Sequence, residues 1–247
     1  MTTSRSTTSI ASSDRATSST VPTTGKVFGI GFNKTATKSL CAACEQLGLR
    51  TLHDSHRVSH TLDSNYEKGL RLLDSLEDYD AYFDLGFWSA NIPYVDLLRQ
   101  LDRGYPDSRF ILHTRNVDGW VRSRRAHRER KNTRTVIRRL LQRAPPRATG
   151  PEWETEARKL FAECHEAALA RFRGRPRDLL VFDATAGHGW PELCSFLGRP
   201  VPTDSGDEPL PFPHRGKTQE ISLYRRRYYP LLRMLRRLEE RFIDRDA

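Results

Sequence analysis

The stretch KVFGIGFNKTATKSL, from Lys26 to Leu40, decides the fold class. It contains a short apolar run, a turn with two glycines, then Lys34 and Thr35, and finally a sequence typical of a helix. A chain that passes from a strand through such a turn into a helix points backbone N–H groups of the first helical turn at an anion. The stretch therefore predicts a phosphate-binding loop after a buried strand.

The loop matches neither of the two common nucleotide-binding fingerprints. A Walker A loop reads G-x-x-x-x-G-K-[ST]; Gly29 has the right distance to Lys34 and Thr35, but Asn33 replaces the second glycine. A dinucleotide fingerprint needs a third glycine after Gly29 and Gly31, where this chain has Lys34. We therefore expect a phosphate-bearing ligand of another kind.

The length and charge of the chain restrict its class. Its 247 residues suffice for one α/β domain but not for two of full size. The net charge of +10 fits a nucleic-acid or membrane partner, and it fits equally a pocket for several phosphate and sulfate charges. No signal peptide or spanning apolar segment is predicted, which favours a cytoplasmic protein with reduced thiols. The C-x-x-C of Cys41 and Cys44 lies on the apparent buried face of a helix, which favours a structural role.

The domain organisation follows from composition. Residues 1–25 are rich in Ser, Thr, Ala and Arg, which predicts a disordered tail; an organellar transit peptide is the alternative. Residues 26–247 are predicted to form a single domain that ends in a basic helix at about 219–243.

Apolar runs alternate with amphipathic segments, a pattern that predicts βαβ units. The expected fold is α/β, with three layers and a central parallel sheet flanked by helices. Strands are predicted at 27–31, 50–53, 81–85, 109–114 and 178–183. Helices are predicted up to residue 47, around 63–76, up to about 103, and at 118–142 and 152–173.

Polar residues gather just beyond the predicted strand ends, where parallel α/β proteins bind ligands. The first block follows VFGIG and contains Asn33, Lys34, Thr35, Thr37 and Ser39. The second follows RFILHT and contains Arg115 and, about two helical turns later, Ser123. A later segment, PFPHRGK, adds Arg215, Gly216 and Lys217. These blocks supply cations and hydroxyls to one rim of the sheet.

Together these blocks resemble the sulfotransferases that use 3'-phosphoadenosine 5'-phosphosulfate, a branch of the P-loop fold. The stretch NKTATKSL is similar to their loop P-K-[TS]-G-T-[TS]-[SW]-L, and Arg115 and Ser123 have the eight-residue spacing of their 3'-phosphate site. The stretch LLVFDATAGHGWPELCSFLGRPVP, followed by PFPHRGK, resembles the small-molecule branch that includes a schistosome sulfotransferase. The resemblance extends from Val27 to about Lys217.

The resemblance implies roles for the matched residues. The donor would be 3'-phosphoadenosine 5'-phosphosulfate, with no metal required. Lys34 would contact the bridging and leaving oxygens. The other residues implied in donor binding are Asn33, Thr35, Ala36, Thr37, Lys38 and Ser39 at the 5' end, and Arg115, Ser123, Arg215, Gly216 and Lys217 at the 3'-phosphate.

The loop also departs from the family pattern. Asn33 replaces the usual Pro, Ala36 replaces Gly, and Lys38 replaces Thr or Ser. An alanine at a position that needs a positive φ is strained. Either the backbone at Ala36 is helical, or the affinity for the donor is modest.

Several residues compete for the role of catalytic base. Asp84, after the strand AYF, matches the Asp of the D-x-P-F stretch in the resembled branch, whereas its alternative role is to cap a turn. His53 and His56 are the competitors, because a neutral imidazole is the more usual general base. A metal site formed by these histidines and His60 is a weaker alternative. Asp183 ends a strand as a Walker B acid would, although a capping role fits it better.

The predicted activity is transfer of a sulfuryl group to a hydroxyl of a small, aromatic or amphiphilic acceptor. The expected pocket walls are Phe83, Phe87, Trp88 and Tyr94, together with parts of the basic helix after Trp120. One alternative is a small-molecule kinase or NTPase of the P-loop fold. Another is a basic protein that binds nucleic acid through RSRRAHRERK and RRRYYPLLRMLRR, but it gives the matched loop no function. We expect neither a nucleic-acid partner nor a membrane span.

Overall fold

A computed structural model of the protein describes residues 25–53, 55–85, 92–127 and 151–215. Within them lies a five-stranded sheet with the order β2-β3-β1-β4-β5, in which every pair of neighbours is parallel. The strands are β1 (Val27–Gly29), β2 (Thr51–His53), β3 (Ala81–Phe83), β4 (Arg109–His113) and β5 (Leu179–Phe182). The predicted parallel sheet is thus confirmed.

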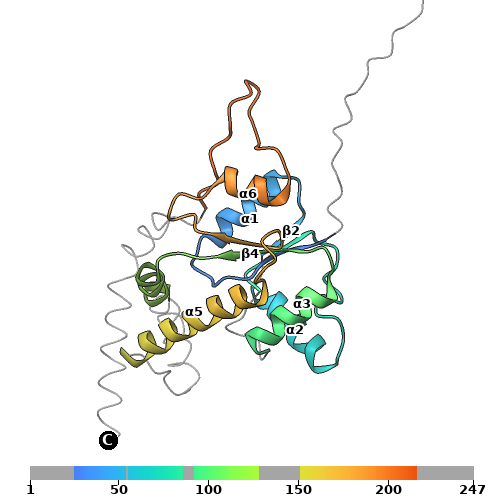
Figure 1. The fold of residues 1–247 in the computed structure, drawn as a ribbon, viewed down its shortest axis with the longest axis vertical. Coiled ribbons are helices and arrows are strands. Elements are labelled where there is room, and N and C mark those ends of the chain that lie inside the picture. Colours follow the sequence, from blue (N-terminus) through green and yellow to red (C-terminus); the bar gives the residue numbers. More distant parts are fainter. Residues whose placement is uncertain (1–24, 54, 86–91, 128–150, 216–247) are drawn as a thin grey trace, which may run out of the picture.

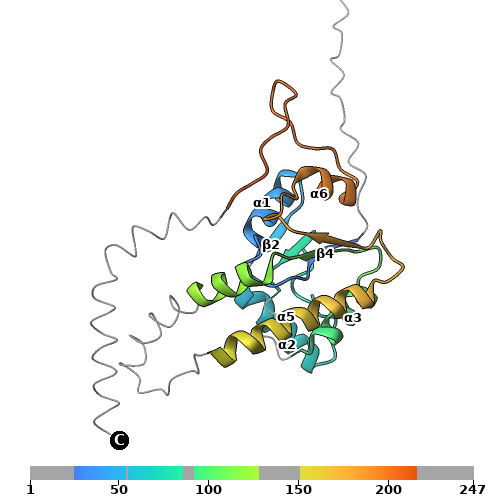
Figure 2. The same ribbon diagram turned by 60° about the vertical axis from the view of Figure 1, so that its left-hand side comes forward.

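Helices cover both faces of the sheet, as Figures 1 and 2 show. One face carries α1 (Thr37–Gln46) and α6 (Trp190–Leu197). The other carries α2 (Ser55–Glu67), α3 (Tyr94–Gly104) and α5 (Pro151–Arg171). This three-layer α/β arrangement confirms the predicted fold class.

The central strands are buried on both faces because their side chains alternate between two cores. In β1, Val27 packs in the core under α1 and α6, whereas Phe28 packs in the core formed with α2, α3 and α5. In β4, Ile111 joins the first core, and Phe110 and Leu112 join the second. A third, smaller cluster contains Phe32, Trp120 and Phe161 and joins the loop after β1 to α5. Burial on both faces fixes the position of the strand ends, and thus of the site.

Two helices differ from the sequence prediction. A helix was expected around 63–76, but α2 runs over Ser55–Glu67. Gly69, at φ +67°, follows its end, and the Asn65 side chain donates hydrogen bonds to the carbonyls of Leu72 and Asp74. These bonds stabilise a turn in place of further helix. The helix α6 was not predicted, although Gly189 and Gly198 bound it and Glu192 accepts a bond from the Gly189 N–H at 2.8 Å.

Some predictions fall outside the described residues. These are the N-terminal tail up to residue 24, the helix at about 219–243, and the part of the predicted helix 118–142 beyond residue 127. The described part of that helix covers 117–127 and lies beside α5 (Figure 2). Among the helices described, none combines the length and apolar character needed to cross a membrane.

The cysteines are buried and free of disulfides, as expected for structural thiols. Burial raises the pKa of Cys41 to about 11 and that of Cys164 to about 12. Cys44, three residues after Cys41 on α1, also has a raised pKa because it is buried. High pKa values make these thiols poor nucleophiles and poor metal ligands near neutral pH.

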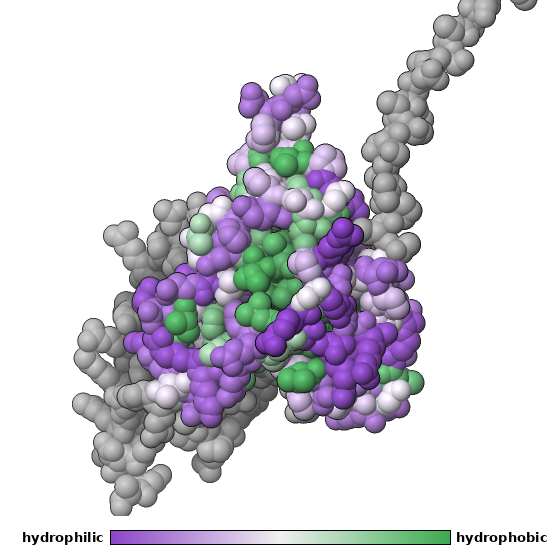
Figure 3. Space-filling view, in the orientation of Figure 1, coloured by the Kyte–Doolittle hydropathy of each residue, from purple (hydrophilic) through white to green (hydrophobic). Residues whose placement is uncertain are grey.

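The surface shown in Figure 3 has an apolar area in the middle, surrounded by hydrophilic residues. The exposed large apolar side chains of the described residues include Val181 on the edge strand β5 and Leu169 on α5.

Candidate active site

The loop between β1 and α1 passes closely over the end of β4. A Cβ on Gly31 would lie 1.9 Å from the carbonyl oxygen of His113, so this position admits only glycine. Beyond it the backbone turns sharply: φ is +71° at Lys34 and +63° at Ala36. The backbone at Ala36 is therefore left-handed and strained, and the expectation of a right-handed helical backbone at this position is wrong.

The N-terminus of α1 is suited to an anion. Ala36 is its N-cap, no side chain caps the helix, and the first turn contains no acid. The N–H groups of a first turn have no partner within the helix, and they carry the positive end of the helix dipole. Thr37, Lys38 and Ser39 form this turn; the Ser39 N–H already donates to the Ala36 carbonyl at 2.9 Å, and the Lys38 side chain is exposed. The start of α1 thus offers hydrogen-bond donors and positive potential.

The helix at 117–127 fixes the loop from one side. The indole Nε1 of Trp120 donates to the Asn33 carbonyl at 3.0 Å, and Arg124 donates to the Asn33 side-chain oxygen at 2.8 Å. Phe32 packs on Trp120, with ring centroids 5.2 Å apart. Asn33, at the position of the usual Pro, thus anchors the loop through both its backbone and its side chain.

Arg115 reaches this loop from the end of β4. Its Nη1 donates to the Lys34 carbonyl at 3.2 Å, across 81 residues of sequence. Its Nε is buried and has no hydrogen-bond partner among the described residues, and none of their carboxylates forms an ion pair with it. The side chain lies against Gly119, where a Cβ would be 3.1 Å from Nη2. A half-buried cation that has no counter-ion among the described residues is suited to an anionic ligand.

The C-terminal segment approaches the loop from the other side. The Arg215 N–H donates to the Ser39 hydroxyl at 2.9 Å, across 176 residues of sequence. Arg215 therefore lies beside the first turn of α1, while Gly216 and Lys217 are outside the described residues. Ser123 is half-buried on the helix at 117–127, which also holds Trp120. The structure thus brings the first, second and third blocks of the sequence to one edge of the sheet.

The comparison with protein families agrees with this geometry. A family model described as a sulfotransferase domain matches residues 26–221, most of the chain. The chain belongs to the sulfotransferase family. A search of curated proteins finds no match.

Two threonines of the sulfotransferase loop point their hydroxyls into the protein. Thr35 Oγ1 donates to the Phe32 carbonyl and lies 2.7 Å from Nδ1 of His113. Thr37 Oγ1 lies 3.1 Å from Nε2 of His53. Both threonines are buried, so they contact protein groups through their side chains and leave their backbone N–H groups as the possible ligand contacts.

The two main candidate bases follow neighbouring strands. Asp84 comes directly after β3, is half-buried and has a φ of +56°. The register that pairs Phe28 with Tyr82 places Asp84 level with Ile30, close to the start of the loop. His53 ends β2, the strand that pairs with β3, and its Nε2 lies 3.1 Å from Thr37 Oγ1.

Other predicted residues lie elsewhere or have other contacts. Asp183 Oδ1 accepts hydrogen bonds from Thr185 and Ala186, which is the capping role expected for it. The described residues contain no group of three His, Cys, Asp or Glu side chains that could hold a metal ion. His56 falls on α2, where its side chain is outside the description.

One predicted pocket wall is wrong. Phe83 is fully buried and packs in the core against Gly29, where a Cβ would meet its ring at 2.4 Å. Tyr94 is partly buried and donates to the Ile30 carbonyl at 2.9 Å, so it does lie near the end of β1. Phe87 and Trp88 are outside the described residues.

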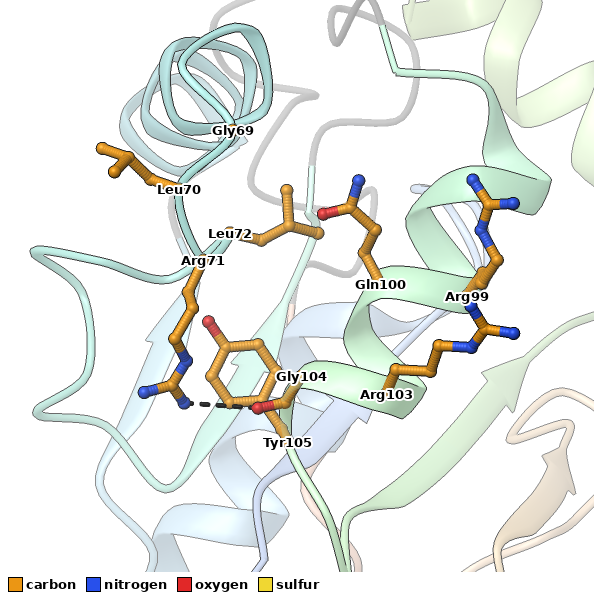
Figure 4. A pocket seen from close by; sticks show the side chains of 9 residues that line it. All are labelled: Gly69, Leu70, Arg71, Leu72, Arg99, Gln100, Arg103, Gly104 and Tyr105. Carbon is orange, nitrogen blue, oxygen red and sulfur yellow. Dashed lines mark hydrogen bonds between the residues drawn. The ribbon is translucent and has the colours of Figure 1, made fainter.

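A groove of about 430 Å³ lies at the opposite edge of the sheet (Figure 4). It is lined by Gly69, Leu70, Arg71, Leu72, Arg99, Gln100, Arg103, Gly104 and Tyr105. Arg71 pairs with Glu77 at 3.1 Å and Arg99 pairs with Asp96 at 2.6 Å. Because two of its three arginines already have acidic partners, and because it lies where strands begin, this groove is not part of the loop site.

Proposed function

We propose that this sulfotransferase transfers a sulfuryl group from 3'-phosphoadenosine 5'-phosphosulfate to a hydroxyl of a small acceptor. The observation that carries the proposal is the convergence of three sequence blocks on one loop. Arg115 donates to the Lys34 carbonyl, and Arg215 donates to Ser39 in the first turn of α1. The family match supports sulfuryl transfer in general, and these contacts support this donor.

The chain offers separate groups for the two ends of the donor. The N–H groups at the start of α1, with Lys34, suit the 5'-phosphate and the sulfate. Arg115 suits the 3'-phosphate because its buried Nε has no partner within the described residues. We assign Ser123 and Arg215 to the same phosphate, together with Gly216 and Lys217. The donor supplies both the sulfuryl group and the phosphate leaving group. The protein therefore needs only to position the donor and the acceptor and to stabilise the charge that develops between them.

Asp84 is the proposed general base. Its carboxylate would accept the acceptor's hydroxyl proton while the acceptor oxygen forms a bond to sulfur and the bond from sulfur to the 5'-phosphate oxygen breaks. Lys34 would stabilise the charge that develops on that oxygen. His53 is the second candidate, but its Nε2 already lies 3.1 Å from Thr37, so it would have to leave this contact to reach an acceptor.

The proposed acceptor is aromatic or amphiphilic. Tyr94 lies near the end of β1, and Phe87 and Trp88 follow β3 in the sequence. Aromatic side chains near a strand end are typical of pockets for such molecules. The proposal also includes a single domain from residue 26 onward and a cytoplasmic location.

A thermal-shift comparison tests the donor. We expect 3'-phosphoadenosine 5'-phosphate to raise the melting temperature by several degrees, because a ligand at ~100 times its dissociation constant adds about 2.7 kcal/mol to the free energy of unfolding. ATP with magnesium and NAD, tested at the same concentration, are the comparison ligands. Stabilisation by ATP with magnesium and not by the bisphosphate would replace this proposal with a kinase.

A further inference from the structure

His113 is a polar residue at the centre of the protein that the proposed chemistry does not use. It ends β4 and is 0% exposed. Burial lowers its pKa to about 3, so the imidazole is neutral. Its Nε2 is buried and has no hydrogen-bond partner among the described residues. An unpartnered buried nitrogen is unfavourable for stability, so some other contact of the ring has to account for a histidine here.

That contact is with the phosphate-binding loop. Thr35 Oγ1 lies 2.7 Å from Nδ1 of His113, and its only proton is donated to the Phe32 carbonyl. The hydroxyl therefore accepts from His113, which fixes the imidazole as the tautomer with the proton on Nδ1. Gly31 allows this approach, since a Cβ there would lie 2.5 Å from Nδ1. The loop thus wraps around the ring.

The wrapped segment contains the strained part of the loop. Lys34 and Ala36, on either side of Thr35, have φ angles of +71° and +63°. Side chains with a Cβ disfavour this region, and such strain persists only where surrounding contacts over-determine the backbone. Two hydrogen bonds hold this segment: His113 Nδ1 bonds to the Thr35 hydroxyl, and Arg115 Nη1 donates to the Lys34 carbonyl at 3.2 Å.

We propose that His113 is a positioning residue that holds the loop in its ligand-ready conformation against the strain at Ala36. The hydrogen bond to Thr35 balances the cost of the left-handed backbone, so that the ligand does not have to impose this conformation when it binds. The inference rests on the proposed function for the ligand, but the loop's conformation can be measured without any ligand.

Hydrogen exchange of the ligand-free protein is the first test. In His113→Leu we expect the amides of Ser39 and Leu40, which donate to the Ala36 carbonyl at 2.9 and 3.1 Å, to exchange about tenfold faster than in the wild type, as a lost buried hydrogen bond allows. His113→Asn, whose side-chain amide can donate from nearly the position of Nδ1, should stay close to the wild type. Leu101→Ala, a buried change on α3, is the control for a general loss of stability and should leave these amides unaffected relative to the rest of the sheet.

Rescue by Ala36→Gly is the second test, because glycine adopts a positive φ without strain. The affinity for 3'-phosphoadenosine 5'-phosphate is measured by calorimetry. We expect His113→Leu to weaken binding about tenfold. In that background Ala36→Gly should recover much of the loss, and its gain in affinity there should exceed the gain that the same substitution gives in the otherwise wild-type protein.

The role of His113 and the identity of the donor are refuted by different results. Unchanged exchange of the Ser39 and Leu40 amides in His113→Leu would refute the positioning role, whatever the ligand. So would an equal effect of Ala36→Gly in both backgrounds. Failure of the wild type to bind the bisphosphate would refute the proposed donor, while the exchange data would still decide the role of His113.

Discussion

Replacing Arg115 with alanine is the most direct test of the donor site. Arg115 Nη1 donates to the Lys34 carbonyl of the loop at 3.2 Å. Its buried Nε has no partner within the described residues. The substitution should therefore remove a contact to the loop and, in the complex, a charged contact to the 3'-phosphate.

The two losses can be estimated separately. A charge-assisted contact to phosphate in a half-buried site is worth about 2 to 4 kcal/mol, which corresponds to a loss of affinity of about 30- to 700-fold. The hydrogen bond to the Lys34 carbonyl is an ordinary contact to a neutral acceptor, worth about 1 kcal/mol or about fivefold. Only the first loss depends on the presence of a 3'-phosphate.

Calorimetric titration with two ligands separates them. With 3'-phosphoadenosine 5'-phosphate, Arg115→Ala should show the full loss; with adenosine 5'-phosphate it should show only the fivefold part. Arg103→Ala, an exposed arginine of the groove in Figure 4, is the control for net charge and should change neither affinity appreciably. An equal penalty with both ligands would refute the placement of the 3'-phosphate and leave Arg115 with a structural role.

The remaining predictions concern the base and the stability of the fold. Asp84→Asn should lower turnover by about 10² to 10⁴ while nucleotide affinity stays within a few fold, since general base catalysis contributes that range; His53→Gln should cost far less. Asp102 is 8% exposed and binds the guanidinium groups of Arg171 and Arg175, whose hydrogen bonds lower its pKa below the ordinary value. Asp102→Asn should destabilise the protein by about 2 kcal/mol, less than for a fully buried pair because Arg175 is 41% exposed.

The same lowered pKa predicts a pH dependence. The contribution of Asp102 is fully present above the pKa of an unfolded aspartate and is lost as the pH falls through its lower folded value. The free energy of unfolding, measured in urea at several pH values, should therefore fall less steeply toward acid pH in Asp102→Asn than in the wild type. Parallel curves for the variant and the wild type would contradict this linkage. If His53→Gln abolishes turnover and Asp84→Asn retains it, the general base is His53 and not Asp84.

Local sequence patterns predicted much of the fold because they depend on neighbouring residues. The apolar runs at 27–31, 109–114 and 178–183 are strands because they are short and bounded by polar residues, and their alternation with helices required a parallel sheet. The helix expected around 63–76 was wrong, because the side chain of Asn65 stabilises a turn through carbonyls of residues 72 and 74, and apolar periodicity does not reveal such a contact.

The sequence by itself determined the α/β class, the position of the loop after β1 and the residue types at the strand ends, since strands, turns and helix starts are encoded over a few residues. Only the tertiary structure decided which of these residues meet: Arg115 with Lys34, Arg215 with Ser39, and His113 with Thr35. It also decided that the Thr35 hydroxyl faces the interior and that Ala36 is left-handed. These features depend on the order and register of strands that pair across about 80 residues of sequence, and no local preference specifies them.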